Sequence, residues 1–95
     1  MTSKQRAYLR GLANNAETIL IVGKDGVTDN VFNQADEALE ARELIKMKCL
    51  ETSMLSAREA AEEIAEEVRA EVIQVIGSKA VLYRASKKPK IVLPR

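Results

Sequence analysis

The amino-acid sequence predicts an α/β fold in which helices pack against one four-stranded mixed sheet. Hydrophobic spacing switches between the helical and the strand period in the order α-β-α-β-α-β-β, and only a Gly-Ser turn separates the last two strand segments. Strands joined through a helix favour parallel pairing, whereas a hairpin is antiparallel. We therefore expect a two-layer sandwich of helices against a mixed sheet.

The N-terminal half predicts a helix, a strand and a second helix. Thr2 and Gln5 have the spacing of a capping box, so the first helix begins there, and it ends at the Asn pair 14–15. The run Ile-Leu-Ile-Val at 19–22 has no polar alternation, which predicts a strand buried on both faces. A second helix begins at 28–29, after a glycine-containing break.

The C-terminal half predicts a strand, a helix and a hairpin. Residues 44–50 alternate, so that Ile45, Met47 and Cys49 point one way and Lys46 and Lys48 the other. Ser56 and Glu59 form a capping box, behind which apolar residues recur at helical spacing as far as Val68. Strands follow at 72–76 and 80–85, and 91–93 is expected to pack or to add a short edge strand.

Composition restricts the possible functions. We expect one domain over residues 1–95, ending in a basic tail at 87–95. There is no His, and the single Cys49 cannot form an internal disulfide or a thiolate cage, so we expect no enzyme, no metal and no cofactor. No run approaches the ~18 apolar residues of a membrane helix, and the basic N-terminus is unlike a signal peptide, so we expect a cytoplasmic protein.

Charge is unevenly distributed, although the net charge is only +1. Residues 1–24 hold four bases and one acid, and residues 72–95 hold six bases and no acid. Residues 52–71 hold two bases and six acids. If the fold brings the two basic ends together, the molecule has one basic and one acidic surface.

The segment Gly23-Lys24-Asp25-Gly26 fits a binding function best. It lies between a predicted strand and a helix N-terminus, whose free amides and dipole favour an anion such as phosphate. Its glycines let the backbone approach a ligand closely, as in the GXXG loop of KH domains. The alternative is a plain turn, since Gly-x-x-Gly arises often by chance, and Asp25 opposes phosphate. Lys46, Lys48 and Arg84 either extend a basic surface or are ordinary solvent-facing residues.

Longer segments form a pattern along almost the whole chain. They are Ser3-Lys4-Gln5-Arg6 with Leu9-Arg10, Val22-Gly23-Lys24-Asp25-Gly26-Val27-Thr28, Ala38-Leu39, Glu43-Leu44-Ile45-Lys46, Ile76-Gly77, Val81-Leu82-Tyr83-Arg84 and Lys90-Ile91-Val92-Leu93-Pro94. In order and spacing this pattern resembles the YhbY/CRM family. The resemblance implies a domain similar to the C-terminal domain of translation initiation factor three.

The resemblance also implies a function. It implies a non-catalytic protein that clamps an RNA backbone and assists assembly of the large ribosomal subunit, with precursor ribosomal RNA as the partner. We expect a monomer, with no membrane and no small-molecule substrate as partner. The expected RNA contacts are Gly23, Lys24, Asp25, Gly26, Thr28, Lys4, Arg6, Arg10, Arg84, Lys87 and Lys88.

Two alternatives remain open from the residues. One is an Alba-like chromatin protein that binds DNA as a dimer. The other is a protein-interaction adaptor that presents the acidic face of the third helix to a basic partner; that face carries Glu62, Glu63, Glu66 and Glu67.

Overall fold

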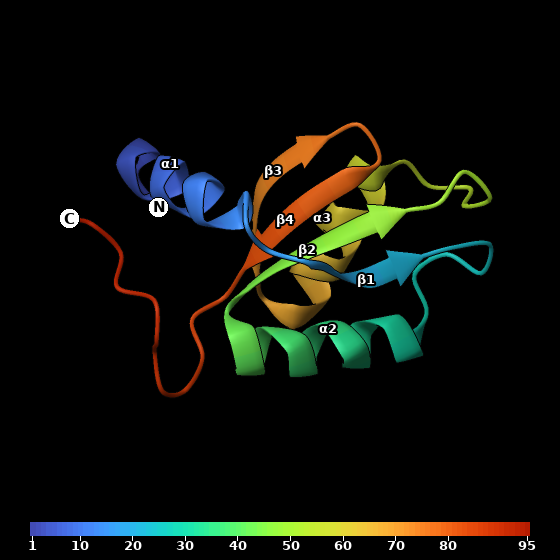
Figure 1. Ribbon diagram of the computed structural model, residues 1–95. Helices are drawn as coiled ribbons and strands as arrows, with labels where there is room; N and C mark the ends of the chain where they lie inside the picture. Colours follow the sequence, from blue (N-terminus) through green and yellow to red (C-terminus); the bar gives the residue numbers. More distant parts are fainter.

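A four-stranded mixed sheet lies at the centre of the molecule (Figure 1). The structure, a computed structural model, describes residues 1–95. Its elements, in the predicted order, are α1 (Ser3–Ala13), β1 (Thr18–Val22), α2 (Asp29–Arg42), β2 (Leu44–Cys49), α3 (Ala57–Val68), β3 (Glu71–Ile76) and β4 (Lys79–Tyr83). None of the helices combines the length and the apolar character needed to cross a membrane.

The strands lie in the order β1-β2-β4-β3, with β1 parallel to β2 and the other neighbours antiparallel. The predicted mixed sheet is therefore confirmed. The strands β2 and β3 flank α3 in the chain and run in the same direction, but they do not pair because β4 lies between them.

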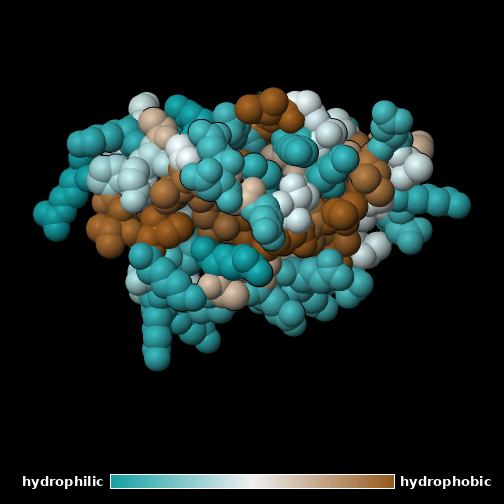
Figure 2. All heavy atoms as spheres, viewed as in Figure 1, coloured by the Kyte–Doolittle hydropathy of each residue, from teal (hydrophilic) through white to brown (hydrophobic).

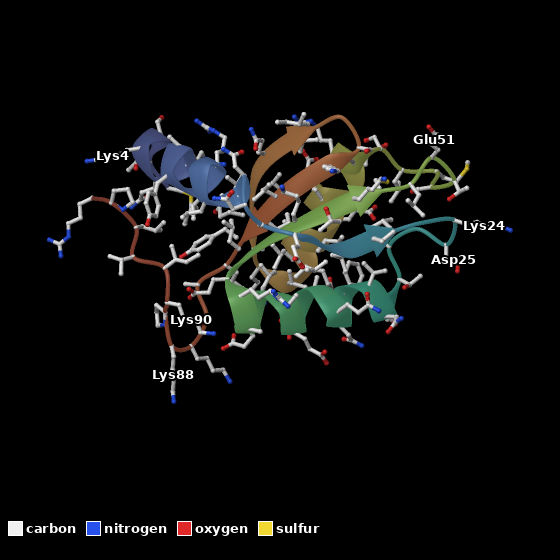
Figure 3. All side chains as sticks on the ribbon, in the orientation of Figure 1. Lys4, Lys24, Asp25, Glu51, Lys88 and Lys90 are labelled. Carbon is white, nitrogen blue, oxygen red and sulfur yellow. The ribbon has the colours of Figure 1, made fainter.

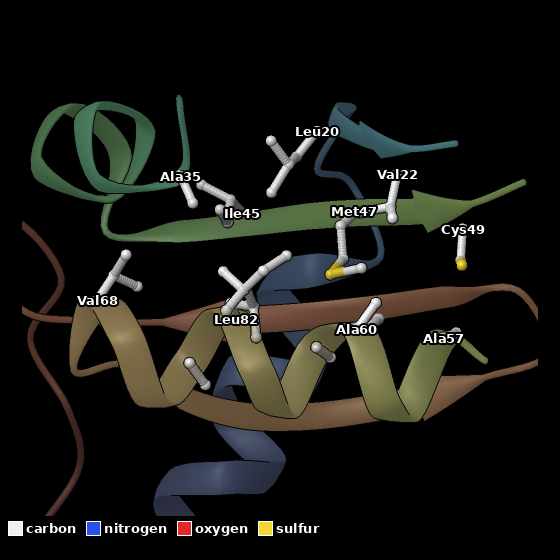
Figure 4. Close-up of a cluster of buried hydrophobic side chains, with 14 of the residues drawn as sticks. Leu20, Val22, Ala35, Ile45, Met47, Cys49, Ala57, Ala60, Val68 and Leu82 are labelled. Atoms are coloured by element: carbon white, nitrogen blue, oxygen red, sulfur yellow. The ribbon is translucent and has the colours of Figure 1, made fainter. Parts of the chain in front are cut away.

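The main core lies between one face of the sheet and the helices α2 and α3 (Figure 4). Leu20, Ile45, Met47 and Leu82 point from the strands into this core and are almost completely buried. Alanines on α3 face them, which allows the helix to approach the sheet closely. The predicted capping box is present: Ser56 Oγ accepts from the Glu59 amide at 3.1 Å.

The other face of the sheet is covered at one end only. There Leu9 and Ala13 of α1 form a second cluster with strand residues that point away from α2 and α3: Leu44, Ile73, Val81 and Tyr83. The two predicted layers describe most of the sheet, and α1 adds a third layer at this end. The segment that joins α1 to β1 crosses the same face, and no helix covers the strands beyond it (Figure 1).

Two details of the sequence-based prediction were wrong. Residues 19–22 were predicted to be buried on both faces, yet Ile21 is 56% exposed, because β1 is an edge strand whose outer face nothing covers. The last strand ends at Tyr83 rather than at residue 85. Of the two outcomes predicted for residues 91–93, packing is observed: Ile91 and Leu93 pack against the second cluster, and no strand forms there.

Candidate nucleic-acid interface

The Gly23–Gly26 segment forms a tight turn between β1 and α2. The Gly26 amide donates to the Gly23 carbonyl at 3.0 Å, which places Lys24 and Asp25 at the tip. Gly26 has φ +71°, a left-handed conformation that glycine adopts without strain. A Cβ atom on Gly26 would meet nothing within 4 Å, so conformation rather than space favours glycine here.

The tip of this turn is exposed. Lys24 and Asp25 project away from the body of the molecule (Figure 3). None of the four ion pairs involves the Lys24 ammonium, so it is available to an external anion. The Asp25 carboxylate lies next to it in the chain and opposes the same anion.

Thr28 has a local role at the start of α2. Its Oγ accepts from the Val31 amide at 3.3 Å, and its carbonyl accepts from the Phe32 amide at 3.0 Å. The amides of Asp29 and Asn30 belong to the helix end that has no intrahelical acceptor. Asp29 itself is acidic, which favours the helix but repels a phosphate at this point.

The basic residues of α1 differ in what they contact. Arg6 joins α1 to β3, because its Nη1 donates to the Val72 carbonyl at 2.8 Å and its Nη2 lies 3.2 Å from Oε2 of Glu71. Lys4 donates to the Arg95 carbonyl at 3.4 Å. Arg10 is exposed and has no ion-pair partner. Of the three, Arg10 is the most available to an external anion.

Arg84 is part of the packing between β4 and the two large helices. Its Nη1 donates to Oδ1 of Asp36 at 2.6 Å and to the Val68 carbonyl at 2.8 Å. Its Nη2 donates to the Asp36 carbonyl at 3.1 Å and lies 3.6 Å from Oε1 of Glu40. The side chain is only 18% exposed. Arg84 therefore has a structural role in the packing of these elements, and its contact with RNA stays a prediction.

One buried carboxylate fixes the C-terminal tail. The Glu43 side chain is fully buried and accepts four hydrogen bonds: from the Ser86 amide at 2.7 Å, the Ser86 hydroxyl at 3.0 Å, and the Lys90 and Ile91 amides at 2.8 Å each. Burial by itself raises the pKa of Glu43, but these hydrogen bonds outweigh it and lower the pKa to about 2. The tail is therefore anchored, and Lys87 and Lys88 extend from a defined position.

Sequence reasoning missed this function of Glu43. The residue follows α2 with φ +67°, and nothing in the local sequence identifies the donors, which come from more than forty residues further along the chain. The tail follows β4, and the pairing of β4 with β2 brings its donors to Glu43. No group of three or more Cys, Asp or Glu side chains is placed to hold a metal ion.

The predicted contact residues do not form one site. Lys24 and Asp25 lie at one end of the molecule, and Lys4 and Lys88 lie at the other (Figure 3). The longest dimension is 39 Å, and Lys4 and Lys88 lie apart from the turn along the molecule. The uncovered face of the sheet lies between the two ends, and it carries Lys46, Lys48 and Lys79. The sequence indicated the first two, whereas Lys79 was missed.

Comparison with known proteins identifies the family of the chain. Residues 1–84 match the CRS1/YhbY (CRM) domain. The chain belongs to this family. The chain is also 43% identical over 90 residues to a Bacillus subtilis protein named "Probable RNA-binding protein YqeI", and the match covers 95% of this chain and 94% of that one.

Two further relatives have similar lengths. An RNA-binding protein of Haemophilus influenzae is 35% identical over 95 residues, which cover all of this chain and 96% of the relative. The solution structure of a hypothetical Staphylococcus aureus protein, a candidate for RNA binding, matches with a TM-score of 0.82 and 46% identity over 99% of both chains.

Proposed function

We propose that this protein binds RNA without catalysing a reaction, that the Gly23–Gly26 turn contacts the RNA backbone, and that the complex assists assembly of the large ribosomal subunit. The observation that carries the proposal is the exposed turn, which presents an unpaired Lys24 and a Gly26 of positive φ at one end of the molecule. The family and the names of the relatives support RNA as the partner.

Phosphate contacts supply most of the affinity in this proposal. A lysine at the tip of a protruding turn reaches a phosphate group as a point charge, and the adjacent backbone amides add hydrogen bonds. Such contacts read no base sequence, so sequence preference is weak and affinity falls steeply with salt. Asp25 lowers this affinity, because its carboxylate faces the same backbone.

The charge distribution supports an orientation for the RNA. Together α2 and α3 carry nine acids and two bases, whereas α1 and residues 84–95 carry eight bases and no acid. RNA therefore approaches the side of the sheet away from α2 and α3. On a long RNA, Arg10, Lys87 and Lys88 form a second zone of phosphate contacts. Residues 1–95 act as one monomeric RNA-binding unit in this proposal.

The test compares Gly26→Asp with Gly26→Asn, measured by thermal unfolding and by titration with a structured RNA on the same samples. Asn and Asp have the same shape and tolerate positive φ, so each costs about 1 kcal/mol of stability. Gly26→Asp places a carboxylate at the turn, so it weakens RNA binding more than Gly26→Asn does, and more than Lys24→Ala. The parent protein co-sediments with particles of the large-subunit precursor, whereas the Gly26→Asp variant does not.

Two results contradict this proposal. If Gly26→Asp stays folded and binds RNA like Gly26→Asn, the turn is no phosphate contact. If the parent binds duplex DNA more tightly than structured RNA at equal salt, the Alba-like alternative is correct. Replacing Glu62, Glu63, Glu66 and Glu67 with Gln tests the adaptor alternative. Our proposal predicts that RNA affinity stays equal or rises slightly, whereas the adaptor alternative predicts that activity is lost.

A further inference from the structure

One row of side chains crosses all four strands on the uncovered face of the sheet. Ile21 pairs with Lys48, Lys48 pairs with Lys79, and Lys79 pairs with Ile76. The two isoleucines at the ends of the row are 56% and 65% exposed, and both lysines are exposed. We call this row, with the adjoining Lys46 and Gln74, the open sheet face. Figure 2 shows hydrophobic and hydrophilic residues intermixed on this side of the molecule.

The two central lysines are unfavourable for the fold. Like charges directly opposite one another on neighbouring strands destabilise a sheet. Lys48 and Lys79 occupy such a pair, and none of the ion pairs of the chain includes either of them or Lys46. These lysines concentrate positive charge beside exposed apolar side chains. A polyanion that also carries apolar rings complements both features.

A pocket lies beside this row, where α1 ends against the sheet. Its volume is about 170 Å³, and its lining includes Asn14, Lys46, Gln74, Ile76 and Lys79. Pockets for drug-sized ligands are larger, roughly 300–1,000 Å³, so a single ring system fits better. The amides of Asn14 and Gln74 supply donors and acceptors, which match the edge of a nucleobase.

We infer that the open sheet face binds single-stranded RNA, with one unpaired base in the pocket and the adjoining phosphates on Lys46, Lys48 and Lys79. This inference rests on the proposed function, since it takes RNA as the partner. The base packs against Ile76 and the amides of Asn14 and Gln74 contact its edge. A duplex presents no free base to the pocket, so this face distinguishes single strands from duplexes.

The position of the face agrees with contact at the turn. Ile21, the first residue of the row, lies on β1 two residues before Gly23. The row continues from Ile21 to its neighbour Lys48 and on toward β3. Neighbouring strands lie about 4.8 Å apart, so the row spans about 14 Å and accommodates two or three nucleotides. A strand of RNA that leaves the turn reaches the row directly.

The experiment compares three variants with the parent. Lys48→Gln/Lys79→Gln removes the central charges, Ile76→Ala removes the apolar wall, and Arg42→Gln/Arg58→Gln removes two exposed charges from the helices on the opposite face. The probes are a short single-stranded RNA of mixed sequence and the blunt duplex of the same sequence. Affinity is measured over a range of salt concentrations, and thermal unfolding is recorded for each variant.

The inference predicts that the parent binds the single strand more tightly than the duplex. In Lys48→Gln/Lys79→Gln that preference is lost, and the slope of log affinity for the single strand against log salt falls by about 1.4. Its melting temperature is unchanged or higher, because a like-charge pair is removed. Ile76→Ala weakens binding of the single strand at an unchanged slope, and Arg42→Gln/Arg58→Gln behaves like the parent.

The possible failures are distinguishable. If the parent binds neither probe, or if Gly26→Asp has no effect on binding, the proposed function is wrong. If Gly26→Asp weakens binding while Lys48→Gln/Lys79→Gln matches the Arg42/Arg58 control, only the open sheet face is excluded. Equal affinity of the parent for single strand and duplex also overturns the inference.

Discussion

The two ends of the molecule use their basic side chains differently. At the turn end, Lys24 projects into solvent and forms no ion pair. At the opposite end, Arg6 donates to the Val72 carbonyl and Arg84 donates to Asp36 and Val68. All three residues belong to one family pattern in the sequence. A basic residue in a binding motif can therefore hold the fold together, and only its contacts distinguish that role from ligand binding.

Removing the carboxylate that anchors the tail has the largest effect that we predict. In the unfolded chain the Glu43 carboxyl titrates at about 4.5, and in the folded protein its pKa is about 2. The folded protein therefore binds fewer protons than the unfolded chain across this interval, so its stability is complete above pH 4.5 and falls as the pH decreases to 2. The loss is on the order of 3 kcal/mol. Glu43→Gln shows a similar loss at neutral pH, because buried amides of the tail lose their acceptor.

Denaturant unfolding from pH 7 to pH 2 measures both effects, with the exposed Glu37→Gln as the matched control. Glu43→Gln flattens the acid limb of the stability curve, whereas Glu37→Gln follows the parent. The turn lies at the other end of the molecule, so Glu43→Gln retains the RNA contact at the turn while it is folded. Equal acid limbs for Glu43→Gln and the parent would show that this carboxylate does not anchor the tail.

A charge-conserving change at Arg84 separates structure from binding with a smaller effect. Arg84→Lys keeps the positive charge but loses the planar fork that reaches Asp36 and Val68 together. We expect a loss of about 2 kcal/mol in unfolding free energy, with unchanged RNA affinity in the folded protein. Arg10→Lys is the control, because Arg10 has no such partners and its replacement leaves stability unaltered. If Arg84→Lys is as stable as the parent but binds RNA poorly, Arg84 contacts RNA rather than stabilising the fold.

Local patterns predicted much of the fold. The capping box and the apolar spacing of α3 identify the helix and its buried face without reference to the rest of the chain. The alternation in β2 correctly assigned Ile45 and Met47 to the core and Lys48 to the outer face. Both patterns record a periodicity that the element itself imposes, so they can be interpreted from the sequence alone.

Properties that depend on neighbours in space could not be predicted in this way. Ile21 is exposed because β1 is the edge strand and α1 covers only the distant end of the sheet. Glu43 is buried because the tail folds over it. Lys79 was missed because its significance comes from its pairing with Lys48, which depends on β4 lying beside β2.

Mapping the RNA contact by the amide signals of the protein in solution tests the central proposal most directly. Titration of the labelled protein with a structured RNA is expected to shift the signals of residues 23–26. The signals of α3, which carries the acidic face, are expected to stay in place. Shifts confined to α3, with residues 23–26 unaffected, would contradict RNA binding by the turn.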